Sequence, residues 1–207
     1  MPPHLTKTED APSRLEELGL TPGDLAQAVQ LGLSSAATCT KHDPSNLPGL
    51  ILWGRTIRGL RDALVPRGWK SENTYNYPTV VSPDRSVAIS VAGGDYYTGR
   101  TDGVPSTRSS KGPVTRAAVI QNQLTFAELD ASFAELNPAP RTTWLLLHHH
   151  DQEAKEVRME LSLPAGLDAD DVVTAWHERI LLEPFTTAYE PPAPLEEVEI
   201  EVPLTRR

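Results

Sequence analysis

The sequence predicts an α+β fold, in which an antiparallel sheet built from two hairpins carries helices packed on one face. Three observations lead to this fold class: two pairs of β-prone segments are each joined by a short turn, and one long segment spaces its apolar residues as a helix does. Consecutive hairpins imply antiparallel pairing, because each tight turn reverses the chain. The length of 207 residues and the 39% hydrophobic content fit one globular domain.

The first hairpin is expected over residues 78–91. A short apolar segment, 78–81, and a second one, 87–91, flank the turn Ser82-Pro83-Asp84-Arg85, in which proline and aspartate suit a type I turn. The second hairpin is expected over residues 144–163. Its return segment alternates Val157, Met159, Leu161 and Leu163 with polar residues, which predicts one buried face and one solvated face.

The clearest helix is predicted for residues 47–64, where apolar residues recur every three or four positions and so form one stripe: Leu50, Trp53, Ile57, Leu60 and Leu64. Arg58 and Asp62 are four residues apart on the other side, and we expect them to pair. A second helix is expected to begin at Thr21-Pro22-Gly23-Asp24, where threonine caps the first turn. Further helices are expected over 113–124, over 125–136 and around Val172, Val173, Trp176 and Ile180.

The chain is expected to comprise a flexible leader (1–12), one α+β domain (13–185) and a Pro/Glu-rich C-terminal segment (186–207). Val198, Ile200 and Val202 alternate with glutamates in that last segment, so it is either an edge strand with protective charges or a disordered acidic tail. The single cysteine excludes an internal disulfide, and neither a signal peptide nor a membrane-spanning apolar run is apparent. We therefore expect a cytoplasmic protein without membrane contact.

Charge is distributed unevenly along the chain, whose net charge is −9. Residues 55–116 contain ten basic and five acidic residues, whereas the rest of the chain contains nine basic and 23 acidic residues. A basic central region in an acidic chain is typical of a surface for an anionic partner, such as nucleic acid, a nucleotide or an acidic protein. The alternative is that the two regions attract each other within the fold.

A long polar loop, 93–111, is the first candidate site. Glycine backbone, nearby cations and a following helix start are what a phosphate site uses, although neither nucleotide-binding glycine signature is present. A mobile connector is the alternative. Together with two arginines on the exposed face of the 47–64 helix, the expected anion-binding residues are Arg55, Arg58, Gly93, Gly94, Thr98, Arg100, Arg108 and Lys111.

A second candidate is the run His148-His149-His150-Asp151. On a strand, His148 and His150 share one face, and with Asp151 they form the weak beginning of a metal site. The alternative is a polar strand end at a hairpin tip. No standard catalytic motif is present, including G-x-S-x-G and H-E-x-x-H. We therefore expect no cofactor and lean towards a protein that is not an enzyme.

Several segments resemble a family of uncharacterised bacterial proteins known as hypothetical open reading frames. The segments that carry this resemblance are Cys39-Thr40 with Pro44, Trp53 with Arg58-Gly59-Leu60-Arg61, Gly68-Trp69, Val80-Val81-Ser82-Pro83, Gly94-Asp95 with Thr98-Gly99, Lys111-Gly112-Pro113, Trp144-Leu145-Leu146 and Glu160-Leu161-Ser162-Leu163-Pro164. The resemblance implies a bacterial cytoplasmic protein and brings no activity, cofactor or catalytic residue.

The sequence thus predicts a binding or accessory protein that engages an anionic partner through its basic central region. Two alternatives stay open. One is a metal-dependent hydrolase or nuclease that uses Asp95 and the histidine run, and the other is a purely structural protein-interaction module. The sequence predicts neither the ligand nor the oligomeric state.

Overall fold

The computed structural model describes residues 3–74, 76–127 and 141–188. The strands are β1 (His4–Thr6), β2 (Lys70–Thr74), β3 (Tyr77–Val81), β4 (Val87–Gly93), β5 (Thr142–Asp151), β6 (Glu156–Leu167) and β7 (Val173–Thr186). The α-helices are α1 (Ala11–Glu17), α2 (Pro22–Ala36), α3 (Leu47–Leu64) and α4 (Pro113–Ala127), and a 3-10 turn, Val65–Arg67, follows α3. The α+β fold class is thereby confirmed.

One seven-stranded sheet organises the molecule, with strand order β1-β7-β6-β5-β4-β3-β2. Most neighbours are antiparallel, including the two predicted hairpins, β3–β4 and β5–β6. The sheet is nevertheless mixed, because β4 pairs with β5 in parallel and β1 pairs with β7 in parallel. The β4–β5 pair is parallel because its connection contains α4, which returns the chain to the end of the sheet where β4 begins.

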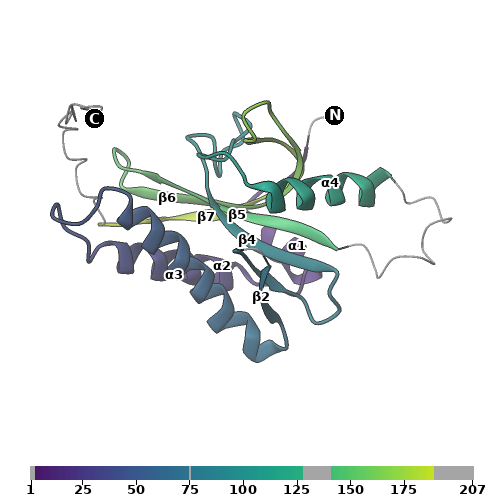
Figure 1. Cartoon of the computed structure of the whole chain (residues 1–207), viewed down its shortest axis with the longest axis horizontal. Helices are drawn as coiled ribbons and strands as arrows, with labels where there is room; N and C mark the ends of the chain where they lie inside the picture. Colours follow the sequence, from purple (N-terminus) through teal and green to yellow (C-terminus); the bar gives the residue numbers. More distant parts are fainter. Residues whose placement is uncertain (1–2, 75, 128–140, 189–207) are drawn as a thin grey trace, which may run out of the picture.

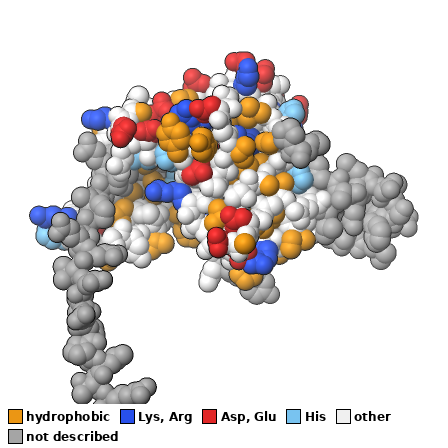
Figure 2. Space-filling view, turned by 90° about the horizontal axis from the view of Figure 1, so that it is seen from above, with side chains coloured by type: hydrophobic (Ala, Val, Ile, Leu, Met, Phe, Trp, Pro, Cys, Tyr) orange, Lys and Arg blue, Asp and Glu red, His pale blue; other side chains and the backbone are white. Residues whose placement is uncertain are grey.

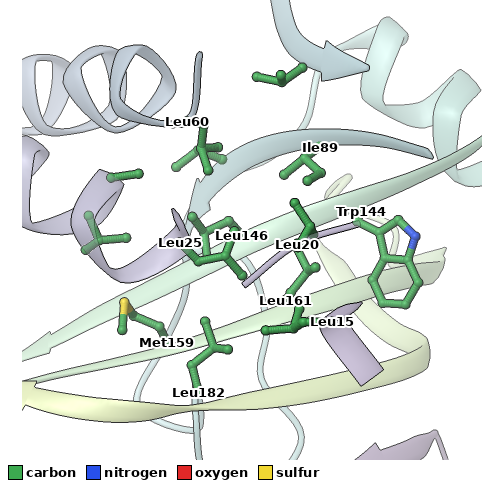
Figure 3. Packing of buried hydrophobic residues seen from close by; sticks show 14 of the residues in the cluster. Leu15, Leu20, Leu25, Leu60, Ile89, Trp144, Leu146, Met159, Leu161 and Leu182 are labelled. Atoms are coloured by element: carbon green, nitrogen blue, oxygen red, sulfur yellow. The ribbon is translucent and has the colours of Figure 1, made fainter. Parts of the chain in front are cut away.

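Helices lie on both faces of the sheet, which corrects the expectation of one covered face. Figure 1 shows α1, α2 and α3 on one side and α4 on the other. The larger core lies under α1–α3, where Leu15, Leu25 and Leu60 meet the sheet residues Leu146 and Leu161 (Figure 3). A smaller core lies under α4 and consists of Ala92, Val119, Leu145, Leu147, Val173 and Trp176.

Local sequence signals explain several elements directly. Helix α2 begins with a reciprocal capping box: the Asp24 N–H donates to the Thr21 hydroxyl (3.3 Å), and the Thr21 N–H donates to the Asp24 carboxylate (2.8 Å). Helix α3 has the bounds that its apolar stripe predicts, and Arg58 pairs with Asp62 at 3.2 Å. Among the described residues, no helix has the length and apolar character needed to cross a membrane.

Two expectations about chain organisation need correction, and one strand was not predicted. The expected leader contains β1 and the start of α1 at Ala11, since His4–Thr6 hydrogen-bonds to the edge of β7. The segment around Val172–Ile180 is the connection into strand β7 and its first half, not a helix. Strand β2, which had no clear apolar pattern, pairs with β3 at the other edge.

Some predicted elements fall outside the described part of the chain. The expected helix over 125–136 contributes only its first residues to α4, which ends at Ala127, and its remainder lies outside the described residues. The same is true of the C-terminal alternatives at 198–204.

Candidate binding surface

The segment 94–112 covers the part of the second sheet face that α4 leaves open. It leaves the end of β4, passes over the sheet on the same side as α4 and then enters that helix (Figure 1). Because side chains alternate along a strand, Arg158, Glu160 and Ser162 of β6 face this segment, whereas their neighbours Val157, Met159 and Leu161 enter the larger core. A row of polar side chains is therefore enclosed between the sheet and the loop.

A buried ion pair lies at the centre of this contact. Glu160 is fully buried and Arg179 of β7 nearly so, and the Arg179 guanidinium donates to both Glu160 oxygens at 2.7 and 3.0 Å. The Ser162 hydroxyl also donates to Glu160. Two buried charges of this kind are stable only when their remaining hydrogen-bonding capacity is satisfied.

Loop backbone groups supply the remaining partners of this pair. The Gly99 N–H donates to Glu160 at 2.8 Å, and Arg179 donates to the carbonyls of Gly103 (2.8 Å) and Arg100 (3.0 Å). Arg158 adds bonds to the carbonyls of Thr98 and Tyr96. Charge-assisted hydrogen bonds from rigid strands therefore fix the loop backbone at several successive residues.

Close packing requires glycine at two loop positions. Gly99 has φ +72°, and a Cβ there would lie 2.9 Å from the Arg158 Cβ. A Cβ on Gly94 would lie 2.1 Å from the Thr98 hydroxyl oxygen. These glycines allow the loop to pack against itself and the sheet, which is a structural reason for the glycine pattern.

The backbone donors of the loop are largely used within the protein. The Gly94 N–H donates to the His148 carbonyl, the Gly99 N–H to Glu160, and the Arg100 N–H to the Tyr97 carbonyl. Thr98 is buried, so its hydroxyl does not face solvent. Phosphate binding by Gly93, Gly94 and Thr98 stays a prediction that this bonding pattern does not favour.

The predicted cations fall into two separate groups. Arg55 and Arg58 lie on the exposed side of α3, in the helical layer across the sheet from the loop, and Arg58 is paired with Asp62. Arg100 is in the loop and is paired with Asp102, at 2.7 Å from Nε. Arg108 is exposed and has no acidic partner within the described residues. Burial lowers the pKa of Lys111, the last cation of the loop.

Three large apolar side chains are exposed on the outer surface of the loop, among exposed polar residues such as Thr101, Asp102 and Arg108. Tyr96, Tyr97 and Val104 are 51%, 42% and 50% exposed. The two tyrosine rings meet edge to face with centroids 5.5 Å apart, and the Arg100 guanidinium lies 4.6 Å from the Tyr96 centroid. We call Tyr96, Tyr97, Arg100 and Val104 the loop surface. Figure 2 views the molecule from this side and shows hydrophobic side chains gathered among charged ones.

The histidine run lies on β5, as predicted, but its members have different surroundings. His148 is buried, and this burial, with a smaller effect of Arg108 and His149, lowers its pKa from 6.5 to about 4. His149 contacts the Gly94 carbonyl, and Asp151 pairs with Arg158. The described residues contain no cluster of three His, Cys, Asp or Glu side chains arranged to hold a metal ion.

Sequence reasoning missed the ion pair and the two tyrosines. The alternation in β6 predicts that Arg158, Glu160 and Ser162 face water, and nothing local indicates that a loop 60 residues earlier in the chain covers them. The adjacent pair Tyr96-Tyr97 inside a glycine-rich polar loop was the available signal for the surface.

In comparisons with known proteins, no protein-family model, curated protein or solved structure matches this chain. The resemblance to bacterial hypothetical proteins therefore stays a prediction. Function is inferred from the site itself.

Proposed function

We propose that this chain is a non-catalytic binding protein that docks an acidic protein partner through the loop surface. The observation that carries the proposal is the combination of exposure and rigidity: three large apolar side chains face solvent on a loop whose backbone is fixed by buried Arg158, Glu160 and Arg179. A surface that is already ordered loses little conformational entropy when a partner binds.

The residue types agree with a protein interface. Tyrosine and arginine are enriched among the residues that dominate binding energy in interfaces, and tyrosine supplies a large contact area with few rotatable bonds. Arg108 adds an exposed positive charge that has no acidic partner among the described residues. An acidic group on the partner would complement it.

Nucleic acid is the less favoured anionic partner. Binding to a phosphate backbone relies on several unpaired cations. Here Arg100 is paired with Asp102, and Arg116 at the start of α4 is paired with Asp171. The carboxylates of these pairs reduce the local positive potential, so a partner with apolar groups and a single acidic contact fits better.

The test is site-specific photo-crosslinking in the cells that produce the protein. A benzophenone amino acid replaces Tyr97 in the full chain, and the same replacement at Ile120, an exposed residue of α4, is the matched control. We expect a protein adduct at position 97 that is absent at position 120. The purified partner should then bind the native chain, and both Tyr96→Ser/Tyr97→Ser and Arg108→Glu should weaken that binding without lowering the melting temperature.

Two results would contradict the proposal. One is equal crosslinking from positions 97 and 120. The other is a thermal stabilisation by nucleotides or short DNA and RNA that disappears in high salt and in Arg108→Glu, because that behaviour is typical of phosphate binding.

A further inference from the structure

A cavity of about 420 Å³ opens where three connections of the chain meet. They are the junction between α1 and α2, the turn that follows α3, and the turn between β3 and β4. This volume is within the range of sites that bind small molecules. We call it the junction cavity, and its lining includes Glu17, Leu18, Arg67, Trp69, Pro83 and Asp84.

Trp69 gives the junction cavity an apolar wall that carries one unused hydrogen-bond donor. The side chain is 4% exposed, and its indole N–H has no hydrogen-bond partner among the described residues. The indole N–H groups of Trp144 and Trp176, by contrast, each donate to an oxygen of the protein. Leu18 and Pro83 add further apolar lining. A ligand in the cavity would therefore meet apolar surface beside a donor that is still available.

Asp84 places a carboxylate without a cationic partner at the same cavity. Its oxygens accept hydrogen bonds from the Ser82 hydroxyl (2.6 Å), the Ser86 hydroxyl (2.8 Å) and the Ser86 N–H (3.1 Å). These bonds, with that from Ser82 the strongest influence, lower the pKa of Asp84 to about 2, so the group is ionised at neutral pH. The neighbouring Arg85 directs its guanidinium to Glu72 instead, at 2.9 Å.

The other charged residues that line the junction cavity are already paired. Arg67 lies 2.6 Å from the Asp24 carboxylate, and Glu17 lies 2.5 Å from the Arg14 guanidinium. Each of these two cations is matched by a carboxylate, so neither neutralises Asp84. The cavity therefore keeps an unbalanced negative charge, which attracts a cation.

The acceptor positions left on Asp84 indicate which type of cation fits. A carboxylate has about four such positions, and three hydrogen bonds from the two serines already use three of them. A guanidinium binds a carboxylate best through two parallel hydrogen bonds, one to each oxygen. An ammonium is a compact charge that can bind through one. The single remaining position therefore favours a primary ammonium.

We infer that the junction cavity binds a small primary amine whose flat apolar body carries an oxygen. The ammonium group pairs with Asp84, the apolar body packs against Trp69, and the oxygen accepts the hydrogen bond that the Trp69 N–H has to offer. No residue of the loop surface lines this cavity, so the inference does not depend on the proposed function.

NMR of the isotope-labelled full chain gives a direct test, because each tryptophan contributes one indole N–H signal. The probe is tyramine, and the matched control is tyrosol, which has the same phenol but a hydroxyl in place of the amine. Trp69→Phe assigns the Trp69 signal. We expect tyramine to shift this signal in a saturable way and to leave the signal of Trp53, which is exposed on α3, unchanged.

Two aspartate variants separate recognition at Asp84 from a general effect of charge. Asp84→Asn keeps oxygen and nitrogen atoms that can bond to both serines but removes the charge, so tyramine should bind about tenfold more weakly. Asp62→Asn removes the same charge from the exposed side of α3 and should leave the affinity unchanged. Tyrosol should bind the native chain about as weakly as tyramine binds Asp84→Asn.

Several results would overturn the inference. Equal affinities for tyramine and tyrosol, or for the native chain and Asp84→Asn, would show that the cavity does not recognise an ammonium through Asp84. Tighter binding of the analogue of tyramine that carries a guanidinium would contradict the choice of a primary amine. A shift confined to Trp53, or no saturable shift of any indole signal, would show that tyramine does not occupy the cavity.

Discussion

The two faces of the sheet are held by different kinds of interaction, and strand β6 shows both. Val157, Met159 and Leu161 enter the apolar core under α1–α3, whereas the residues between them, Arg158 and Glu160, bind the loop 94–112. Apolar burial has little directional preference and gives most of the stability. The buried polar contact is directional, so it determines the conformation of one loop.

The largest expected effect comes from removing one partner of the buried ion pair. Glu160→Ala leaves Arg179 buried without its carboxylate, so we expect a loss of about 3–5 kcal/mol in the free energy of unfolding. Denaturant unfolding measures this loss, and amide hydrogen exchange should show faster exchange over residues 96–104. The control Glu160→Met/Arg179→Met removes both charges and should restore only part of the stability, because the Gly99 N–H and the carbonyls of Arg100 and Gly103 lose their partners. A loss below about 1 kcal/mol would mean that the pair does not hold the loop.

The apolar side of the same strand should respond differently. Leu161→Ala opens a cavity in the larger core and should cost about 2–5 kcal/mol, whereas the volume-conserving Leu161→Met should cost less than about 1.5 kcal/mol. In Leu161→Ala, we expect the most slowly exchanging amides of the whole sheet to exchange faster, and all by a similar factor. If amide hydrogen exchange in Leu161→Ala became faster only in the loop 94–112, the two faces of the sheet would not differ in the way we describe.

His148 makes stability depend on pH. Its pKa is about 4 in the folded protein and 6.5 ordinarily, so below pH 6.5 the unfolded chain takes up a proton that the folded protein does not. This group therefore removes stability as pH falls from 6.5 to 4, by up to about 3 kcal/mol. In His148→Leu the unfolding free energy should fall less steeply over that range. If the free energy of unfolding of the native protein and of His148→Leu changed identically between pH 6.5 and pH 4, His148 would not be the cause of the loss of stability in acid.

The smallest effect concerns the close approach of the loop to β6. Gly99→Ala places a Cβ at positive φ and against Arg158, and should cost about 1–2 kcal/mol. Gly112→Ala is the matched control, because a Cβ there meets no atom within 4 Å. Equal melting temperatures for the two variants would show that the loop adjusts without cost.

Elements with a local signal were predictable from the sequence. The capping residues Thr21 and Asp24 and the apolar spacing of α3 are properties of a few neighbouring residues, and both predictions are confirmed. The segment around Val172 and Trp176 was predicted wrongly because its apolar spacing also suits a helix, and pairing with β6 determines its conformation instead. The partners of Glu160 lie far away in the chain, so neither its burial nor the rigidity of the loop follows from local pattern.

The parallel pairing of β1 with β7 has a consequence for how the chain assembles. His4–Thr6 pairs with Glu178–Ile180, so this contact joins residues more than 170 positions apart. Such a contact closes a very large loop and forms only once the distant segment is in place. During synthesis on the ribosome, strand β1 must therefore wait until β7 has been made before it can complete this edge of the sheet.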